Sequence, residues 1–155
     1  MYSTVVWATD GSDGAECALT EAVRLVELSG GRLLAVHCDH RLNGRAGGWS
    51  ALTAAEDPRV RIERTVDELQ DTGCDVQLVT RKSHREAADV VAEVAAEVDA
   101  DVIVCGTRGL GALAGAFLGS FTQRLLHIAP CPVLAVGPRA EAITVSRRAP
   151  SETLA

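Results

Sequence analysis

A glycine-rich stretch from Gly106 to Thr122 has the residue types and spacing that suit binding of a phosphate group. Five of its residues are glycines, which let the backbone take unusual conformations and let another group approach it closely. No Asp or Glu occurs between residues 102 and 140, so the stretch lies in the least anionic part of the chain. We interpret it as a phosphate cradle.

The last residues of this stretch start a predicted helix. The amides of Gly119, Ser120 and Phe121 would point outward from the helix N-terminus, whose partial positive charge favours phosphate. The hydroxyl groups of Ser120 and Thr122 add two further donors. A flexible or tightly packed loop is the alternative interpretation of such glycines, and the full spacing of the stretch makes it the less favoured one.

Two better-known nucleotide motifs do not account for the stretch. Gly109, Gly111 and Ala114 satisfy the loose dinucleotide fingerprint, but that motif requires an acid about 20 residues further on, and none follows at that distance. No G-x-x-x-x-G-K-[ST] sequence is present, so the pattern does not support a P-loop ATPase.

Asp10 is the leading candidate among the remaining polar residues. It follows a buried apolar run and begins the turn Asp10-Gly11-Ser12. A carboxylate at that place serves either as a turn or capping residue or as a ligand for a ribose or a metal ion. The residue pattern leaves the two readings about equally weighted.

The cysteines, histidines and arginines give weaker signals. Cys38 and Cys105 end apolar runs, and buried core thiols are a better interpretation than a redox sensor. The four histidines have no metal-ligand spacing. Arg108 and Arg124 read mainly as solvated charges, although Arg124 follows Ser120 by four residues and so could reach a phosphate on the same helical side.

Apolar runs and helical patterns alternate along the whole chain. We predict strands at 3–9, 32–38, 74–80, 101–105 and 132–136. Predicted helices separate them: one from Ala15 to a stop at Gly30-Gly31, one over 60–71, one capped by Ser83 with Glu86 completing a capping box, and one from Ser120 to a stop before Pro130.

This alternation predicts an α/β fold, a doubly wound open sheet of parallel strands with helices on both faces. Ligands of such sheets bind beyond the carboxyl ends of the strands, where the winding reverses. Asp10, Cys38 and Gly106 would then meet at one crevice. The stretch 39–57 reads as a long loop, and 139–155 as a C-terminal tail that we expect to be flexible.

Composition places limits on domain number, partners and location. With 155 residues, 47% of them hydrophobic, the chain is the size of one domain. Its net charge of -6 makes nucleic acid an improbable partner. Five cysteines without a C-x-x-C pair suggest reduced, buried thiols. The sequence has no basic start followed by a long apolar stretch and no run of about 18 apolar residues, so we expect a cytoplasmic location.

The residues together resemble the ATP-binding branch of the universal stress protein family. Its glycine motif is matched by Gly106-x2-Gly109-x9-Gly119-Ser120, in the expected place between the fourth strand and the last helix. The Asp10 turn, Val36-His37-Cys38 and the run 129–134 also look like that family. The resemblance covers about residues 1–138, which we take as a single universal stress protein domain.

The resemblance implies a Rossmann-like sheet in the order 3-2-1-4-5, ATP in the crevice, and a homodimer through the last strand, Pro132 to Val136. Asp10 would lie by the ribose or Mg²⁺, and the Cys38 backbone by adenine. The nucleotide-binding set implied in full is Ala8, Thr9, Asp10, Cys38, Gly106, Arg108, Gly109, Gly119, Ser120, Phe121 and Thr122.

Two positions depart from the family pattern. Arg81-Lys82 stands after the third strand where many members have a glycine, which would alter the rim of the crevice. Phe121 is bulkier than the aliphatic residue common after the phosphate-binding serine, and it either restricts the pocket or fills the core.

Three functions follow from these observations. The first is an ATP-binding, dimeric stress sensor or regulator that acts through an unknown regulatory protein partner and is not a dedicated enzyme. The second is a slow Mg²⁺-dependent ATP hydrolase or phosphotransferase, in which Asp10 holds the metal and Ser120 meets the terminal phosphate. The third is a nucleotide-independent interaction module. Asp10 and Asp39 are the carboxylates nearest the predicted crevice. The sequence shows no partner that would raise the pKa of either one, so no general base is recognisable.

Overall fold

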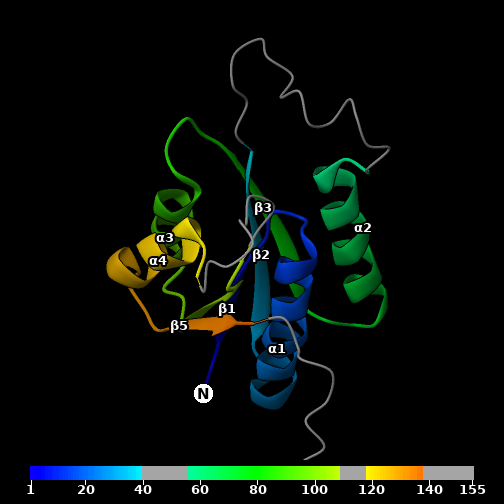
Figure 1. Cartoon of the computed structure of the whole chain (residues 1–155). Helices are drawn as coiled ribbons and strands as arrows, with labels where there is room; N and C mark the ends of the chain where they lie inside the picture. Colours follow the sequence, from blue (N-terminus) through cyan, green and yellow to red (C-terminus); the bar gives the residue numbers. More distant parts are fainter. Residues whose placement is uncertain (40–55, 109–117, 138–155) are drawn as a thin grey trace, which may run out of the picture.

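A five-stranded parallel sheet forms the centre of the molecule (Figure 1). In this computed structural model, residues 1–39, 56–108 and 118–137 are described. The strand order is β3-β2-β1-β4-β5, which confirms the predicted fold class. The strands are β1 (Thr4–Ala8), β2 (Arg32–Asp39), β3 (Val76–Lys82), β4 (Val102–Gly106) and β5 (Val133–Val136).

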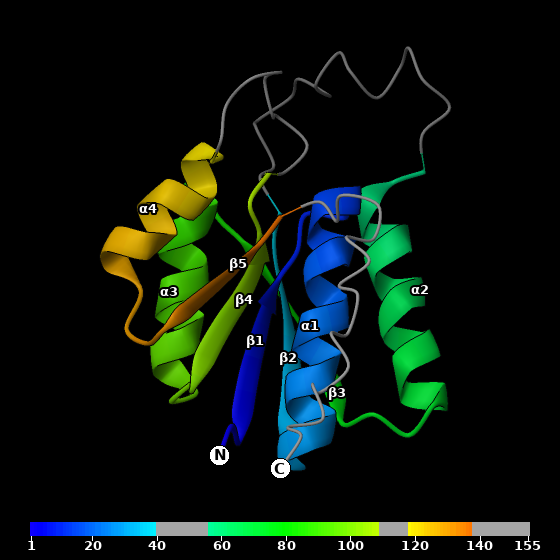
Figure 2. The same cartoon turned by 60° about the horizontal axis from the view of Figure 1, so that its bottom comes forward.

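Two pairs of helices cover the sheet, one pair on each face (Figure 2). Helices α1 (Asp13–Ser29) and α2 (Pro58–Asp71) lie on one face, and α3 (Ala87–Glu97) and α4 (Ser120–Ile128) lie on the other. The winding direction reverses between β1 and β4, because β2 and β3 follow on one side and β5 on the other. This is the switch point at which ligands of open α/β sheets bind.

The side chains of each strand alternate between two hydrophobic cores. Val5 and Trp7 of β1 pack with α1 and α2, whereas Val6 and Ala8 pack with α3 and α4. Trp7 is 1% exposed, and its indole N–H donates to the carbonyl of Ala15 at 2.8 Å. Burial on both faces explains why the central strands β1 and β4 read as continuous apolar runs in the sequence.

Helix α1 has the two ends that its sequence predicts. The Ser12 side chain caps the N-terminus by accepting a hydrogen bond from the Ala15 amide at 3.3 Å. Gly30 closes the C-terminus with φ of +66°, a left-handed conformation that glycine takes without steric cost.

Helix α3 begins three residues later than the capping box predicts, so that prediction is wrong. Ser83 does not cap the helix, because its hydroxyl accepts from the nearby Arg85 amide at 3.0 Å and forms a local turn. Glu86 is the N-cap residue, without a side-chain capping bond. Its carboxylate instead meets Arg124 of α4 at 3.0 Å.

The β2 and β3 strands both extend further than predicted. Asp39 pairs in register with Lys82, and Cys38 with Arg81, so Arg81 and Lys82 belong to the strand and do not follow it. The predicted loop 39–57 falls almost entirely on residues 40–55, and the predicted tail on 138–155, both outside the described residues. Among the described helices, none has the length and apolar character to span a bilayer.

Candidate functional site

Hydrogen bonds join the chain just after β1 to the carboxyl end of β2. Thr9, which follows β1, is buried, and its amide donates to the Val36 carbonyl at 3.0 Å. The Thr9 carbonyl accepts a hydrogen bond from Nδ1 of His37 at 3.0 Å. These bonds hold the backbone of Thr9 beside the end of β2, at the edge where the sequence predicts the crevice.

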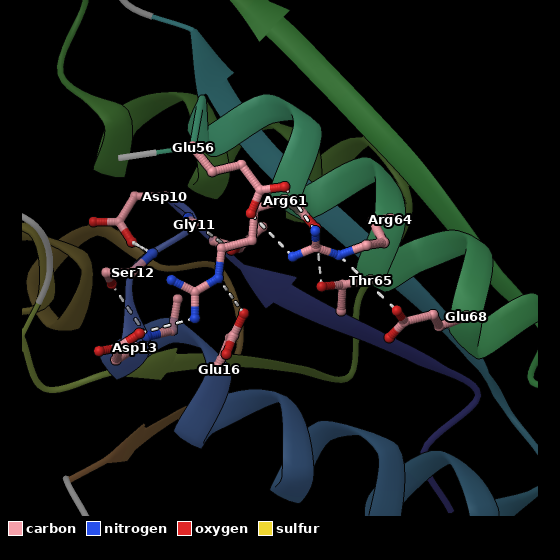
Figure 3. A network of polar contacts seen from close by, with 12 residues as sticks. Asp10, Gly11, Ser12, Asp13, Glu16, Glu56, Arg61, Arg64, Thr65 and Glu68 are labelled. Atoms are coloured by element: carbon pink, nitrogen blue, oxygen red, sulfur yellow. Dashed lines mark hydrogen bonds and ion pairs between the residues drawn. The ribbon is translucent and has the colours of Figure 1, made fainter. Parts of the chain in front are cut away.

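Asp10 lies in a tight turn that leads into α1 (Figure 3). One of its carboxylate oxygens accepts from the Ser12 amide at 3.0 Å, and the Thr9 hydroxyl accepts from the Gly11 amide at 3.2 Å. Gly11 has φ of +76°, and a Cβ there would stand 2.9 Å from Pro58 Cβ. The turn therefore requires glycine, and it holds Asp10 at the strand end where the sequence predicts it.

The end of β2 presents a half-buried thiol and a buried carboxylate. Burial, and next the charge of Asp39, raise the pKa of the Cys38 thiol. The Asp39 carboxylate lies 3.6 Å from the Arg59 guanidinium of α2. A thiol with a raised pKa stays protonated at neutral pH, which does not favour a redox role for Cys38.

Gly106, the first motif glycine, packs against the start of α1. A Cβ on Gly106 would stand 2.5 Å from the Gly14 carbonyl oxygen, and a Cβ on Gly14 would stand 2.4 Å from the Arg108 carbonyl oxygen. Neither position therefore has room for a side chain. The sequence pattern places Gly14 in the turn before the predicted helix, whereas Gly14 lies inside the first turn of α1. A glycine is an unusual choice there, and it signals close approach of another backbone.

The start of α4 is attached to the end of β4. The Gly119 amide donates to the Thr107 carbonyl at 2.8 Å, and the Thr122 hydroxyl donates to the Gly106 carbonyl at 2.9 Å. Thr122 is 1% exposed, whereas Ser120 is exposed. The two hydroxyl groups predicted as phosphate donors thus differ, since only that of Ser120 faces solvent.

The remaining predicted residues take different places around this edge. Phe121 packs against the core beneath α3 and α4, which favours its core-filling interpretation. Arg108 is exposed beside Gly119. Arg124 is held by Asp89 of α3 at 2.8 Å and by Glu86, so it is committed to an ion pair and its pKa is raised, chiefly by Asp89. Gly109 lies outside the described residues.

Cys105 is a core residue at the end of β4. It is 1% exposed. Burial raises the pKa of its thiol to about 11, against a smaller lowering from its hydrogen bond with Thr122. A thiol in this state is protonated and shielded, as the core interpretation requires.

The N-termini of the described helices differ in how favourably they could bind an anion. The N-terminus of α1 carries the Ser12 cap and two acids in its first turn, α2 is capped by Asp57, and α3 has Asp89 in its first turn. Helix α4 has neither an acid in its first turn nor a side-chain cap. Its first N–H groups have no partner within the helix, so among the described helices α4 offers an anion the most favourable terminus.

Arg61 of α2 neutralises the acids at the start of α1. Its guanidinium lies 2.8 Å from Asp13 and 2.6 Å from Glu16 (Figure 3). These bonds raise the pKa of Arg61, with the Glu16 bond as the larger cause. The network holds α2 against the turn that contains Asp10. It was not predicted, because sequence spacing does not reveal pairs 45 and 48 residues apart.

Metal-binding groups are sparse around this edge. Within residues 1–39, 56–108 and 118–137, no three side chains of the His, Cys, Asp and Glu types form a group that could hold a metal ion. A divalent ion at Asp10 would therefore need ligands from a bound phosphate or from water.

Comparison with known proteins places these features in a family. Residues 1–137 match the family model described as the universal stress protein family. A universal stress protein of Thermus aquaticus, described by its place in the QAH/OAS sulfhydrylase 3' region, is 32% identical over 143 residues. The match covers 88% of this chain and 99% of that protein.

Two similar solved structures contain adenine nucleotides. A universal stress protein in complex with cAMP is 27% identical with a TM-score of 0.66, and the match covers 87% of this chain and 97% of that one. The universal stress protein of Archaeoglobus fulgidus in complex with dAMP is 26% identical with a TM-score of 0.64. That match covers 88% of this chain and 98% of the other.

Proposed function

Because this chain belongs to the universal stress protein family, we propose that it binds ATP at the carboxyl edge of its sheet and acts as a dimeric sensor or regulator. Nucleotide occupancy would alter the surface that the protein offers to a regulatory partner. The proposal includes a cytoplasmic location, which rests on the cysteine pattern of the sequence.

The bare N-terminus of α4 is the observation that carries this proposal. The four helices in the described part of the chain begin at the carboxyl edge of the sheet. A phosphate would be repelled by acids or compete with a capping side chain at the three other than α4. At α4 it would meet amides that have no partner within the helix, the exposed Ser120 hydroxyl and no acid in the first turn. This placement also separates the protein from dinucleotide-binding folds, in which the helix after the first strand receives the pyrophosphate.

The bound nucleotides of the similar structures support an adenine nucleotide as the ligand. Both cAMP and dAMP contain adenine and a phosphate. The proposed orientation puts the phosphates at α4, the ribose near Asp10 and the adenine near the backbone of Cys38, because β4, β1 and β2 are consecutive neighbours in the sheet. The uncapped helix terminus would favour the negatively charged phosphate chain of ATP.

Asp10 is compatible with a magnesium ion that accompanies ATP. Sites of this kind usually combine one or two carboxylates with phosphate oxygens and water, and Asp10 supplies one carboxylate at the end of β1. A bound ion would offset the negative charge of the phosphates. Asp10 itself would hold its carboxylate in place through the bond to the Ser12 amide.

The homodimer component rests on the exposed edge of the sheet. β5 is the last strand in the sheet order, and Leu134 on it is 39% exposed. Leu126 and Ile128 of α4 are also exposed apolar residues. Light scattering on the parent and on Leu134→Lys tests this component, which fails if the parent is a monomer at all accessible concentrations.

Calorimetric titration with ATP and Mg²⁺ tests the nucleotide site. Ser120→Glu places a carboxylate at the start of α4, and we expect at least about a tenfold loss of ATP affinity through charge repulsion. The helix itself should not suffer, because an acid at a helix N-terminus is stabilising by about 0.3–1 kcal/mol. Loss of binding would therefore not reflect unfolding.

Gln77→Glu provides the matched control. Gln77 is exposed at the start of β3, at the opposite edge of the sheet, and the substitution adds the same charge. It should bind ATP as the parent does. Equal affinity in parent and Ser120→Glu would contradict the assignment, and mass spectrometry of ligand released from the denatured protein would identify a different nucleotide if one co-purifies.

A further inference from the structure

The Thr122 side chain lies at the start of α4 but faces the interior. It is 1% exposed, and its hydroxyl donates to the carbonyl of Gly106 at 2.9 Å across 16 residues of chain. A hydroxyl group has one proton to donate. While this bond persists, the Thr122 hydroxyl has no proton left for a phosphate.

Two hydrogen bonds of different kinds fix α4 to the end of β4. The Gly119 amide donates to the carbonyl of Thr107, so consecutive carbonyls of the strand end, those of Gly106 and Thr107, each accept a bond from the first turn of α4. The Thr107 amide in turn donates to the Val136 carbonyl at 2.8 Å. The acceptors are therefore part of the ordered sheet.

Gly106 has little freedom to follow a movement of the helix. The Gly14 carbonyl would be 2.5 Å from a Cβ at this position, which means that the backbone of α1 is packed against the Gly106 Cα. With the acceptor held on that side, the bond from Thr122 orients α4 relative to the sheet.

We propose that Thr122 is a positioning residue, whose buried hydroxyl sets the direction of the first N–H groups of α4 and so sets the affinity for phosphate without touching it. This inference rests on the proposed nucleotide site. In this role the Thr122 hydroxyl does not bind the ligand itself. It affects binding of the phosphate chain only, through the orientation of α4.

The other side-chain contact near this helix start constrains it less. Arg124 meets Asp89 and Glu86 of α3, but its side chain is 44% exposed, and an exposed ion pair between long side chains holds geometry weakly. The Thr122 bond is short, buried and made by a side chain with a single torsion before its hydroxyl. It is therefore the stronger constraint on the direction of α4.

Paired titrations with ATP and with adenosine test the proposal. Thr122→Val keeps the shape of the side chain and removes the hydroxyl. We expect ATP affinity to fall about tenfold, the equivalent of one buried hydrogen bond, and adenosine affinity to stay within about twofold. Thr122→Ser restores the hydroxyl and should restore ATP affinity.

Thr65→Val is the control for loss of a helical threonine hydroxyl. That hydroxyl donates to the Arg61 carbonyl within α2 at 3.0 Å, away from α4, and its removal should change neither affinity. If Thr122→Val does not fold, Thr122→Ala serves in its place. Equal losses for ATP and adenosine, or failure of Thr122→Ser to recover affinity, would overturn the positioning role.

Amide hydrogen exchange separates this inference from the proposed function. Without nucleotide, Thr122→Val should speed exchange of the Gly119 amide relative to the parent, because the Thr122 bond to the Gly106 carbonyl no longer holds the helix start. Unchanged exchange overturns the role of Thr122 whatever the ligand. A parent protein that binds no ATP, with faster exchange in Thr122→Val, would instead refute the proposed function.

Discussion

Replacement of Gly106 by alanine should destabilise the protein strongly, for a reason unrelated to any ligand. The added Cβ would stand 2.5 Å from the Gly14 carbonyl oxygen, 2.7 Å from the Gly14 carbonyl carbon and 3.0 Å from the Arg108 carbonyl oxygen. All three atoms belong to the backbone, so no flexible side chain can move away. Either α1 must shift from β4 or the strand end must bend.

The size of the effect follows from the overpacking of a closely packed interior. Such insertions cost about 1–3 kcal/mol, and we expect about 3 kcal/mol here because the backbone of a helix must give way. For a chain of this length, that corresponds to a fall in Tm of about 6–12 °C. Urea unfolding followed by circular dichroism measures the free energy of unfolding directly.

Gly137→Ala is the matched control, one strand away at the end of β5. Its Cβ would lie 3.9 Å from the Thr107 hydroxyl oxygen, an ordinary contact, and its φ is not positive. It should be neutral or stabilise by about 0.4–1 kcal/mol through the unfolded state. A Gly106→Ala protein within about 0.5 kcal/mol of the parent would refute the packing argument.

Three further outcomes follow from single side chains. The Asp101 carboxylate accepts from the Thr4 and Ser3 amides, which lowers its pKa. The stabilisation of the folded protein by this carboxylate should therefore be complete above about pH 4 and disappear as the pH falls through the lowered pKa. The urea midpoints of the parent and Asp101→Asn should differ at pH 6 and converge in acid. The pKa of about 11 for Cys105 should make its alkylation at pH 8 on the order of a hundred times slower in native than in unfolded protein, as mass spectrometry would show. Arg61→Gln should cost about 0.5–1 kcal/mol at low salt and less at 1 M NaCl, measured by urea unfolding.

The sequence predicts the fold well because each element has its own local signal. The order of the strands is confirmed, and Gly30 ends α1 where the pattern places the stop. Helix α3 is the exception. Ser83 and Glu86 have the spacing of a capping box, but Ser83 forms a local turn and Glu86 pairs with Arg124 of a distant helix. A tertiary ion pair is invisible to a local pattern.

The sequence predicts which residues lie at the carboxyl edge of the sheet better than it predicts what these residues contact. Gly106 was chosen for close approach of a ligand, and the structure shows close approach of Gly14. The Thr122 hydroxyl was chosen as a donor to phosphate, and it donates to a carbonyl in the strand. Residue type and spacing indicate that a close contact or a donor is needed, whereas the identity of the partner depends on how the elements pack.

The indole of Trp7 gives the protein an internal optical probe. Its N–H bonds to Ala15 in the first turn of α1, and Trp7 lies on β1, three residues before Asp10 of the following turn. A shift of the turn that contains Asp10 would change the hydrogen bond and the surroundings of the indole, and therefore its emission. The other tryptophan, Trp49, is removed by Trp49→Phe, so that changes in fluorescence then report on the start of α1 without any attached label.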